Sequence, residues 1–280
     1  MKKNRSFRLL ATVVLTCSFL LFVSTASAAV VGTLATGSTG TVTATIASVT
    51  FNPDPAGIGG SNFTCPQAIC DSNVASSTSL TFAGCASGVL GTAGCLSTQE
   101  AIDVNSPIGP GSVGENNFLT FSNNANLVYS LLSIATYSNA SCLGLSVGQS
   151  CVIYPGAALL LTLEANGTQV TLSVSGQASD TGIAGLATGS NYVGGFTQLL
   201  TANLPGGLAP TPANIQAFFC FGSNNISNVN QCDPSASLTS SQSGSFTANA
   251  VPEPSSVAMV LLGGGLTLLG VVRRNSKSRS

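Results

Sequence analysis

Three acidic residues carry the catalytic chemistry that this sequence suggests: Glu100, Asp103 and Glu164. Glu100 and Asp103 are close neighbours along the chain, and Glu164 lies beside an Asn-Gly dipeptide. Two carboxyl groups that flank a glycosidic bond act as general acid and as base or nucleophile, so paired carboxylates are typical of glycan hydrolases. The simpler interpretation, which we favour, is that these side chains are solvated surface charges.

A calcium site is a second candidate, formed by Asp103, Asn105 and Glu115, with Asn116 and Asn117 as further oxygen donors. Carboxylate and amide oxygens are the ligands that Ca²⁺ prefers, and these residues fall in a segment rich in Gly and Pro. Their spacing matches no calcium loop of fixed pattern. The competing interpretation is that they are ordinary turn-forming residues.

A row of threonines, Thr41, Thr43 and Thr45, alternates with apolar residues. Regularly spaced hydroxyl and methyl groups on one face of a strand can order water, which suggests ice binding. Such a surface needs the same row on neighbouring strands. Solvent-facing Thr is also favourable in any strand, and this is the competing interpretation.

The first 28 residues have the features of a secretory signal peptide: a basic start, an apolar stretch and the small residues of a signal-peptidase site. These are Lys2, Lys3, Arg5 and Arg8, then residues 9–23, then Ala26-Ser27-Ala28. We therefore expect an exported protein, with signal peptidase as its first processing partner, whose remaining residues meet an oxidising compartment.

The chain contains nine cysteines, of which Cys17 lies in the signal segment, leaving eight. An even number of cysteines in an exported protein predicts disulfides. Zinc bound by thiolates is disfavoured by the oxidising compartment and by the lack of paired C-x-x-C spacing. The eight cysteines form four pairs that are close in sequence, and we expect each pair to be bonded: Cys65 with Cys70, Cys85 with Cys95, Cys142 with Cys151, and Cys220 with Cys232.

Every basic side chain lies in one of two terminal segments. The eight are Lys2, Lys3, Arg5, Arg8, Arg273, Arg274, Lys277 and Arg279. Residues 29–254 therefore hold all nine acidic residues and no Lys or Arg, and the chain has no His. Nucleic-acid binding relies on cations that neutralise phosphates, and imidazole catalysis requires His, so both are excluded. We also expect no cofactor.

Alternating apolar and polar residues predict short β-strands between residues 29 and 250. The predicted strands are residues 41–51, 79–83, 116–122, 127–137, 191–200, 215–221 and 244–250. A short helix that begins at Pro212 is an alternative for residues 215–221. Residues 30–40 are rich in Gly, Ser and Thr, and residues 56–110 have weak periodicity, so few strands are predicted there.

The strongest structural signal spans residues 157–176, where two alternating runs flank Asn166-Gly167. This dipeptide is favoured in type I′ turns, so we predict a β-hairpin. The side chains expected on its buried face are Leu159, Leu161, Leu163, Val170, Leu172 and Val174.

These strands predict an all-β fold in which residues 29–250 form one antiparallel β-sandwich stapled by disulfides. A closed barrel is the alternative, because a period of two does not report whether a sheet closes.

Residues 251–280 contain three segments in order. The first is stiff and non-helical, because each proline fixes φ and lacks an N–H; it comprises Val251, Pro252, Glu253, Pro254, Ser255 and Ser256. Residues 255–272 carry no charge and are slightly short but adequate for a transmembrane helix, which needs about 20 apolar residues. Arg273 and Arg274 begin a basic end, residues 273–280, which the positive-inside rule keeps in the cytoplasm.

This order of segments resembles the PEP-CTERM sorting signal of bacterial surface proteins. The resemblance rests on the Val-Pro-Glu-Pro sequence at residues 251–254, the two serines after it, the apolar span and the arginine pair. It implies an inner-membrane-anchored precursor that an exosortase, a membrane-embedded transpeptidase, recognises at Pro-Glu-Pro. The resemblance further implies that the tail is removed and that the protein passes to the cell surface or the exopolysaccharide matrix.

The leading hypothesis is a non-enzymatic, structural or adhesive protein of the cell surface or of a biofilm matrix, with exopolysaccharide as a candidate partner. The alternatives are an extracellular glycan hydrolase and an ice- or calcium-binding surface module.

Overall fold

The computed structural model describes residues 30–38, 40–52, 72–82, 84–97, 100–110, 112, 114–138, 141–182, 189–222 and 226–249. The predicted signal peptide, Cys65, Cys70 and the predicted sorting tail lie outside these residues. Within the described ranges the chain is almost entirely β-structure. No helix there is long and apolar enough to cross a membrane.

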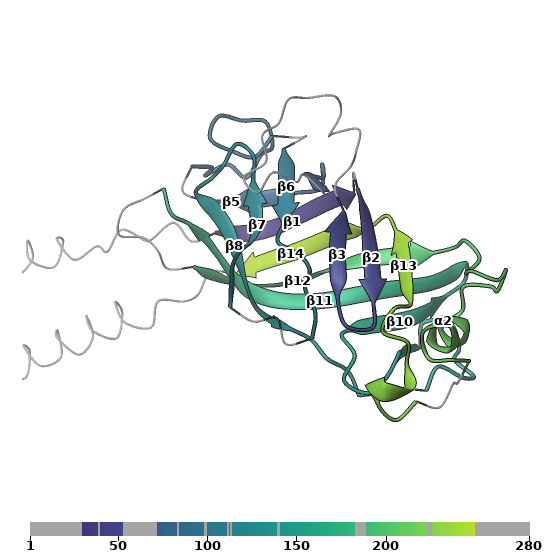
Figure 1. Ribbon diagram of the computed structural model, residues 1–280. Helices are drawn as coiled ribbons and strands as arrows, with labels where there is room; N and C mark the ends of the chain where they lie inside the picture. Colours follow the sequence, from purple (N-terminus) through teal and green to yellow (C-terminus); the bar gives the residue numbers. More distant parts are fainter. Residues whose placement is uncertain are drawn as a thin grey trace, which may run out of the picture. The chain divides into compact units, whose positions relative to one another are not determined.

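Eight antiparallel strands close into a barrel (Figure 1). Around the barrel their order is β12-β14-β1-β4-β6-β7-β8-β11, and β11 pairs again with β12. The strands are β1 (Val31–Ser38), β4 (Ser72–Val74), β6 (Ala101–Val104), β7 (Glu115–Phe121), β8 (Leu127–Ile134), β11 (Gly167–Asp180), β12 (Ser190–Leu200) and β14 (Ser243–Asn249).

The all-β prediction is confirmed, and the fold is the barrel rather than the predicted sandwich. β11 makes the closure possible, because its 14 residues pair with β8 and β10 along one edge and with β12 along the other. The predicted strands were correct in type over most of their length, but side-chain alternation is the same in a closed and an open sheet. Closure leaves the eight barrel strands without an open edge.

β1 is one of three barrel strands that the sequence did not predict; β4 and β6, in the segment of weak periodicity, are the others. Residues 31–38 are rich in Gly and Thr, which hides the alternation of Leu34 and Thr36 toward the barrel interior. β1 pairs with β14 on one edge, and with β4 and then β5 (Ser79–Thr81) on the other. Its low apolar content is compatible with a central position because its neighbours supply most of the buried side chains.

The hairpin predicted at residues 157–176 is confirmed as β10 (Leu159–Glu164) and β11. The turn is displaced by one residue, however, because Glu164 pairs with Gly167 and leaves Ala165 and Asn166 as the turn residues. Neither has a positive φ, so the predicted type I′ turn is wrong, and the positive φ of 155° falls on Gly167.

β9 (Ser150–Val152) ends the sheet beyond β10, and α2 (Pro212–Phe219) covers it. The buried side-chain amide of Gln216 donates hydrogen bonds to the backbone carbonyls of Val152 and Ile153, each at 3.0 Å. The helix therefore supplies donors that a further strand would supply, and it protects this edge from pairing with another chain.

The strand predicted at residues 215–221 is wrong, and the alternative helix from Pro212 is confirmed as α2. Thr211 caps the helix by accepting a hydrogen bond from the Asn214 N–H at 3.3 Å. Pro212 occupies the first turn, where an N–H would have no helical partner. Ile215 and Phe219, four residues apart, then face the core together.

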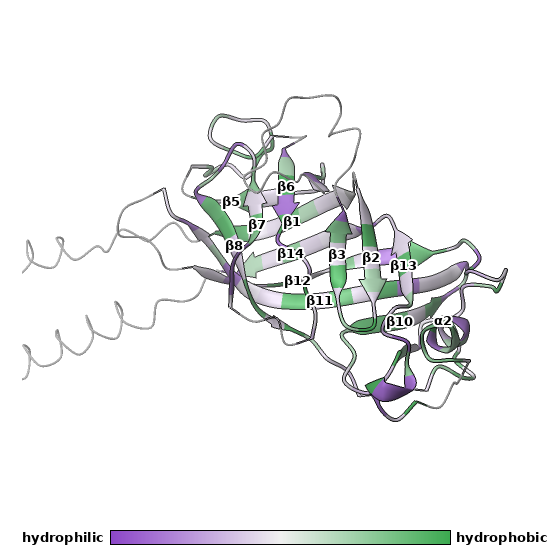
Figure 2. Ribbon diagram, in the orientation of Figure 1, coloured by the Kyte–Doolittle hydropathy of each residue, from purple (hydrophilic) through white to green (hydrophobic). Residues whose placement is uncertain are grey.

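A second, three-stranded sheet consists of β13 (Ser237–Ser240), β2 (Thr41–Thr45) and β3 (Val49–Asn52). β2 and β3 carry green, apolar bands between pale ones in Figure 2. The apolar bands are the buried face, on which Phe51 packs against Phe196 of the barrel with ring centroids 4.6 Å apart. The sheet therefore has one face on the core and one face turned away from it.

The single strand predicted at residues 41–51 is wrong, because it contains a turn between β2 and β3. The Thr45 hydroxyl accepts hydrogen bonds from the backbone N–H groups of Ala47 and Ser48, at 3.2 and 3.0 Å, and donates to the Ser48 carbonyl at 3.2 Å. A threonine side chain that binds the backbone two and three residues later stabilises a tight turn. Ile46 is buried within this turn, so the alternation of apolar and polar residues continues through it. The turn is therefore not visible in the sequence pattern.

Aromatic side chains fill the barrel. Tyr129 and Tyr192 have ring centroids 5.0 Å apart, and Phe196 and Phe246 lie 5.1 Å apart. Gly176 makes room for Tyr192, because a Cβ on this glycine would lie 2.7 Å from the tyrosine ring and 1.8 Å from a backbone oxygen. The interior is therefore a packed core.

The hydroxyls of Tyr129 and Tyr192 are buried and have no hydrogen-bond partner among the described residues. Burial raises the pKa of both phenols above their ordinary value, and the neighbouring Tyr192 raises the pKa of Tyr129 further. Both side chains therefore stay neutral at physiological pH.

Three predicted disulfides are confirmed: Cys85–Cys95, Cys142–Cys151 and Cys220–Cys232. They close loops of 10, 9 and 12 residues in sequence separation. Each fixes local geometry outside the barrel strands. The pairing of Cys65 with Cys70 lies outside the described residues and stays a prediction.

Candidate functional site

Glu100 is fully buried immediately before β6. Its carboxylate accepts hydrogen bonds from the backbone N–H groups of Ser97 and Asn123, each at 3.0 Å. The side-chain amide of Asn124 donates to both carboxylate oxygens, at 2.8 and 3.0 Å. Of these four hydrogen bonds from neutral donors, the three from Asn123 and Asn124 join the segment before β6 to the turn between β7 and β8.

Asp103 and Glu164 lie on different strands. Asp103 is 2% exposed on β6, opposite Thr120 of β7. Glu164 is the half-buried last residue of β10. Two catalytic carboxylates must both reach the substrate. Of the three predicted candidates, Glu164 alone is accessible to solvent, because Glu100 and Asp103 are enclosed.

Two of the three predicted calcium ligands are in contact. The side-chain amide of Asn105 donates a hydrogen bond to the Glu115 carboxylate at 3.3 Å. Asp103 is enclosed. In the described part of the chain, no group of three or more His, Cys, Asp or Glu side chains is arranged to hold a metal ion. Calcium binding by these residues stays a hypothesis that calcium titration would test.

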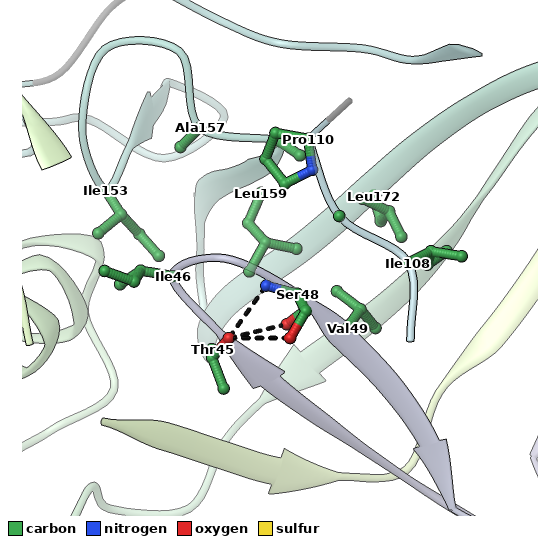
Figure 3. Close-up of a pocket in the computed structure, with 12 residues that line it drawn as sticks. Thr45, Ile46, Ser48, Val49, Ile108, Pro110, Ile153, Ala157, Leu159 and Leu172 are labelled. Atoms are coloured by element: carbon green, nitrogen blue, oxygen red, sulfur yellow. Dashed lines mark hydrogen bonds between the residues drawn. The ribbon is translucent and has the colours of Figure 1, made fainter. Parts of the chain in front are cut away.

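A small hollow lies where the β2–β3 turn meets residues 108–110 and 153–159 (Figure 3). Its volume is about 10 Å³, which is the room for about one water molecule and far below the several hundred Å³ of a ligand pocket. Thr45 and Ser48 on its wall are hydrogen-bonded to each other. The hollow is therefore a packing gap, with an apolar lining that includes Ile46, Val49, Ile108, Ile153, Leu159 and Leu172.

The outer side of the three-stranded sheet carries hydroxyl and amide side chains on every strand. We call this surface the hydroxyl face; it comprises Thr41, Thr43 and Thr45 of β2, Thr50 and Asn52 of β3, and Ser237 and Thr239 of β13. All are exposed or half-buried. The register sets them in rows across the strands, with Thr43 directly opposite both Thr50 and Thr239.

Hydrogen bonds across the strands fix the hydroxyl face. The Thr43 hydroxyl lies 2.9 Å from the Thr239 hydroxyl and accepts a hydrogen bond from the Asn52 amide at 2.8 Å. The same amide lies 3.5 Å from the Thr41 hydroxyl. The requirement that neighbouring strands continue the threonine row is therefore met.

Sequence analysis found the β2 threonines but missed Thr50, Asn52, Ser237 and Thr239 as parts of the same surface. The available signal was the alternation of Val49–Asn52 and of Ser237–Ser240, each with a polar residue at every second position. Nothing in the sequence indicates that two segments almost two hundred residues apart pair with each other.

No curated protein and no solved structure matches this chain. One family description does match, at the C-terminal end: the PEP-CTERM protein-sorting motif, at residues 250–277. The predicted resemblance is confirmed over that segment. The motif implies an exosortase-type processing partner and an exported protein. This chain therefore carries, at its C-terminal end, the PEP-CTERM signal by which proteins are sorted to the cell surface.

Proposed function

We propose that the barrel domain has a non-enzymatic, structural or adhesive role on the cell surface or in the surrounding exopolysaccharide. The observation that carries this proposal is the burial of two of the three candidate catalytic carboxylates. Residues 29–254 contain no Lys, Arg or His, so carboxylates are the leading candidates for acid–base catalysis there. Glu100 and Asp103 are enclosed, and Glu100 has a full structural role.

The packing of the domain supports the same role. Aromatic rings occupy the barrel interior, and the hollow beside the β2–β3 turn holds about one water molecule. Small-molecule sites are usually enclosed cavities of several hundred Å³. An exposed surface is therefore the better candidate for contact with an extended partner.

Glycan cleavage tests the enzymatic alternative. The exported protein is incubated with exopolysaccharide from its own host, and new reducing ends are measured over time. We expect no cleavage. Cleavage that disappears in Glu164→Gln would contradict the proposal and assign catalysis to the accessible carboxylate.

A deletion strain tests the structural or adhesive part. We expect the strain that lacks this protein to form a biofilm with less retained matrix than the parent, and to recover when the full chain is restored. An unchanged biofilm, together with no retention of the protein by exopolysaccharide, would remove this part of the proposal.

A further inference from the structure

We propose that the hydroxyl face binds a neutral polysaccharide chain. This inference rests on the adhesive role proposed above, and it names the surface and the chemical class of its partner.

The hydroxyl face is ordered by hydrogen bonds among its own side chains and by packing of the opposite face of the sheet on the core. Its polar side chains are joined by the bonds of Thr43 to Thr239 and to Asn52. Beneath it, Phe51 is 3% exposed and packs on Phe196 inside the barrel. A surface whose side chains are already ordered loses less conformational entropy when a ligand binds.

The face retains hydrogen-bonding capacity for a ligand. A hydroxyl group has one donor and two acceptor positions. Thr239 is exposed, and its bond to Thr43 uses one of these positions. Thr41 and Ser237 are exposed at the ends of their rows. Sugar hydroxyls, which both donate and accept, match such groups without requiring charge.

Charge selects a neutral partner. The hydroxyl face contains no charged side chain, and residues 29–254 contain nine acidic residues and no Lys or Arg. An acidic polysaccharide would find no cation with which its carboxylates or sulfates can pair, and would be repelled by the net negative domain. A neutral chain meets neither penalty.

The twist of the sheet favours a flexible chain over an ice crystal. Adjacent strands rotate by about 20–25°, so the rows on β3 and β13, two strands apart, diverge by roughly 40–50°. A rigid lattice plane cannot follow that rotation, whereas a polysaccharide can bend along it.

The test uses the processed protein recovered from the surface fraction of its host. Exopolysaccharide from the same host is separated by anion exchange into neutral and acidic fractions, and retardation is measured by affinity electrophoresis in each. We expect retardation by the neutral fraction and little by the acidic one. In the double variant Thr43→Val, Thr239→Val, we expect neutral binding to weaken by about tenfold or more.

The matched control is the double variant Thr33→Val, Thr247→Val. It removes another pair of threonine hydroxyls, 3.3 Å apart across β1 and β14 of the barrel sheet. We expect its binding to stay within about twofold of wild type. Circular dichroism establishes that both variants fold.

Wild-type binding to neither fraction, preferential binding to the acidic one, or equal loss in both variants would each overturn the inference. Ice shaping that is lost with the Thr43 and Thr239 hydroxyls, without neutral glycan binding, would also overturn it. Failure of the wider proposed function would be distinct, because it would appear as polysaccharide cleavage or as an unchanged biofilm in the deletion strain.

Discussion

The Asn124 side-chain amide donates to both carboxylate oxygens of Glu100, at 2.8 and 3.0 Å, in a site that is closed to solvent. Glu100, a residue type that could act in catalysis, therefore connects the segment before β6 to the β7–β8 turn. Because the two backbone donors come from Ser97 and Asn123, the carboxylate is surrounded by N–H groups.

Glu100→Gln should therefore destabilise the protein although it preserves shape. The new amide presents N–H groups to donors that need an acceptor, and leaving buried donors unpaired costs about 1–3 kcal/mol. Urea unfolding measures the loss. Glu164→Gln is the control, since its side chain is half-buried at the end of β10, and it should change stability by less than about 0.5 kcal/mol. Equal midpoints for the two variants would contradict a structural role for Glu100.

The paired phenols inside the barrel predict alkaline instability. Burial raises the folded-state pKa of Tyr129 and Tyr192 above the unfolded value of about 10. As pH rises past that value, the unfolded state releases these protons first, so the free energy of unfolding falls. We expect the urea midpoint to decline above about pH 10.

The double variant Tyr129→Phe, Tyr192→Phe isolates this effect. It removes two buried hydroxyls that have no partner among the described residues, so its stability at neutral pH should equal or exceed that of wild type. Its decline above about pH 10 should be shallower. A decline as steep as that of wild type would assign the alkaline effect to other groups.

Gln216 predicts a local effect at the edge of the sheet. Gln216→Leu keeps most of the side-chain volume but removes the donors to the Val152 and Ile153 carbonyls. We expect a loss of about 1–3 kcal/mol, together with faster hydrogen exchange at β9 and β10 than at β14. Asn214→Ala is the control on the same helix. The hydrogen bond from the Asn214 side-chain amide to the Ala209 carbonyl is exposed and should contribute less to the free energy of unfolding. Exchange that rises equally in all three strands would argue against local protection by α2.

Sequence patterns predicted local elements well where one residue period was long and undisturbed. The β10–β11 hairpin follows from alternation, because β11 buries every second residue from Leu172 to Ala178. In β12 the alternation of burial is limited to residues 190–193. The β2–β3 turn could not be predicted from alternation, because Ile46 continues the period of two while the Thr45 hydroxyl stabilises a turn of the backbone. Residues 215–219 belong to a helix because capping by Thr211 and proline at the first turn outweigh the apolar run.

The arrangement of the candidate site depends on pairings between distant segments. Thr43 and Thr239 share the hydroxyl face through the β13–β2 register, which no local pattern reports. The sequence does not indicate that Glu100 is buried, because its three donor groups lie in a preceding turn and in the β7–β8 connection. The sorting signal was readable for the opposite reason, since its motif, apolar span and basic end are continuous in sequence.

Sorting to the surface with removal of the tail is tested most directly by intact mass. The protein is recovered from the surface fraction of its native host and weighed before and after reduction and alkylation. We predict a chain that begins near residue 29 and ends near residues 251–255, with eight cysteines alkylated only after reduction. A species that retains Arg273 and the residues after it would contradict sorting and make residues 251–280 a plain membrane anchor.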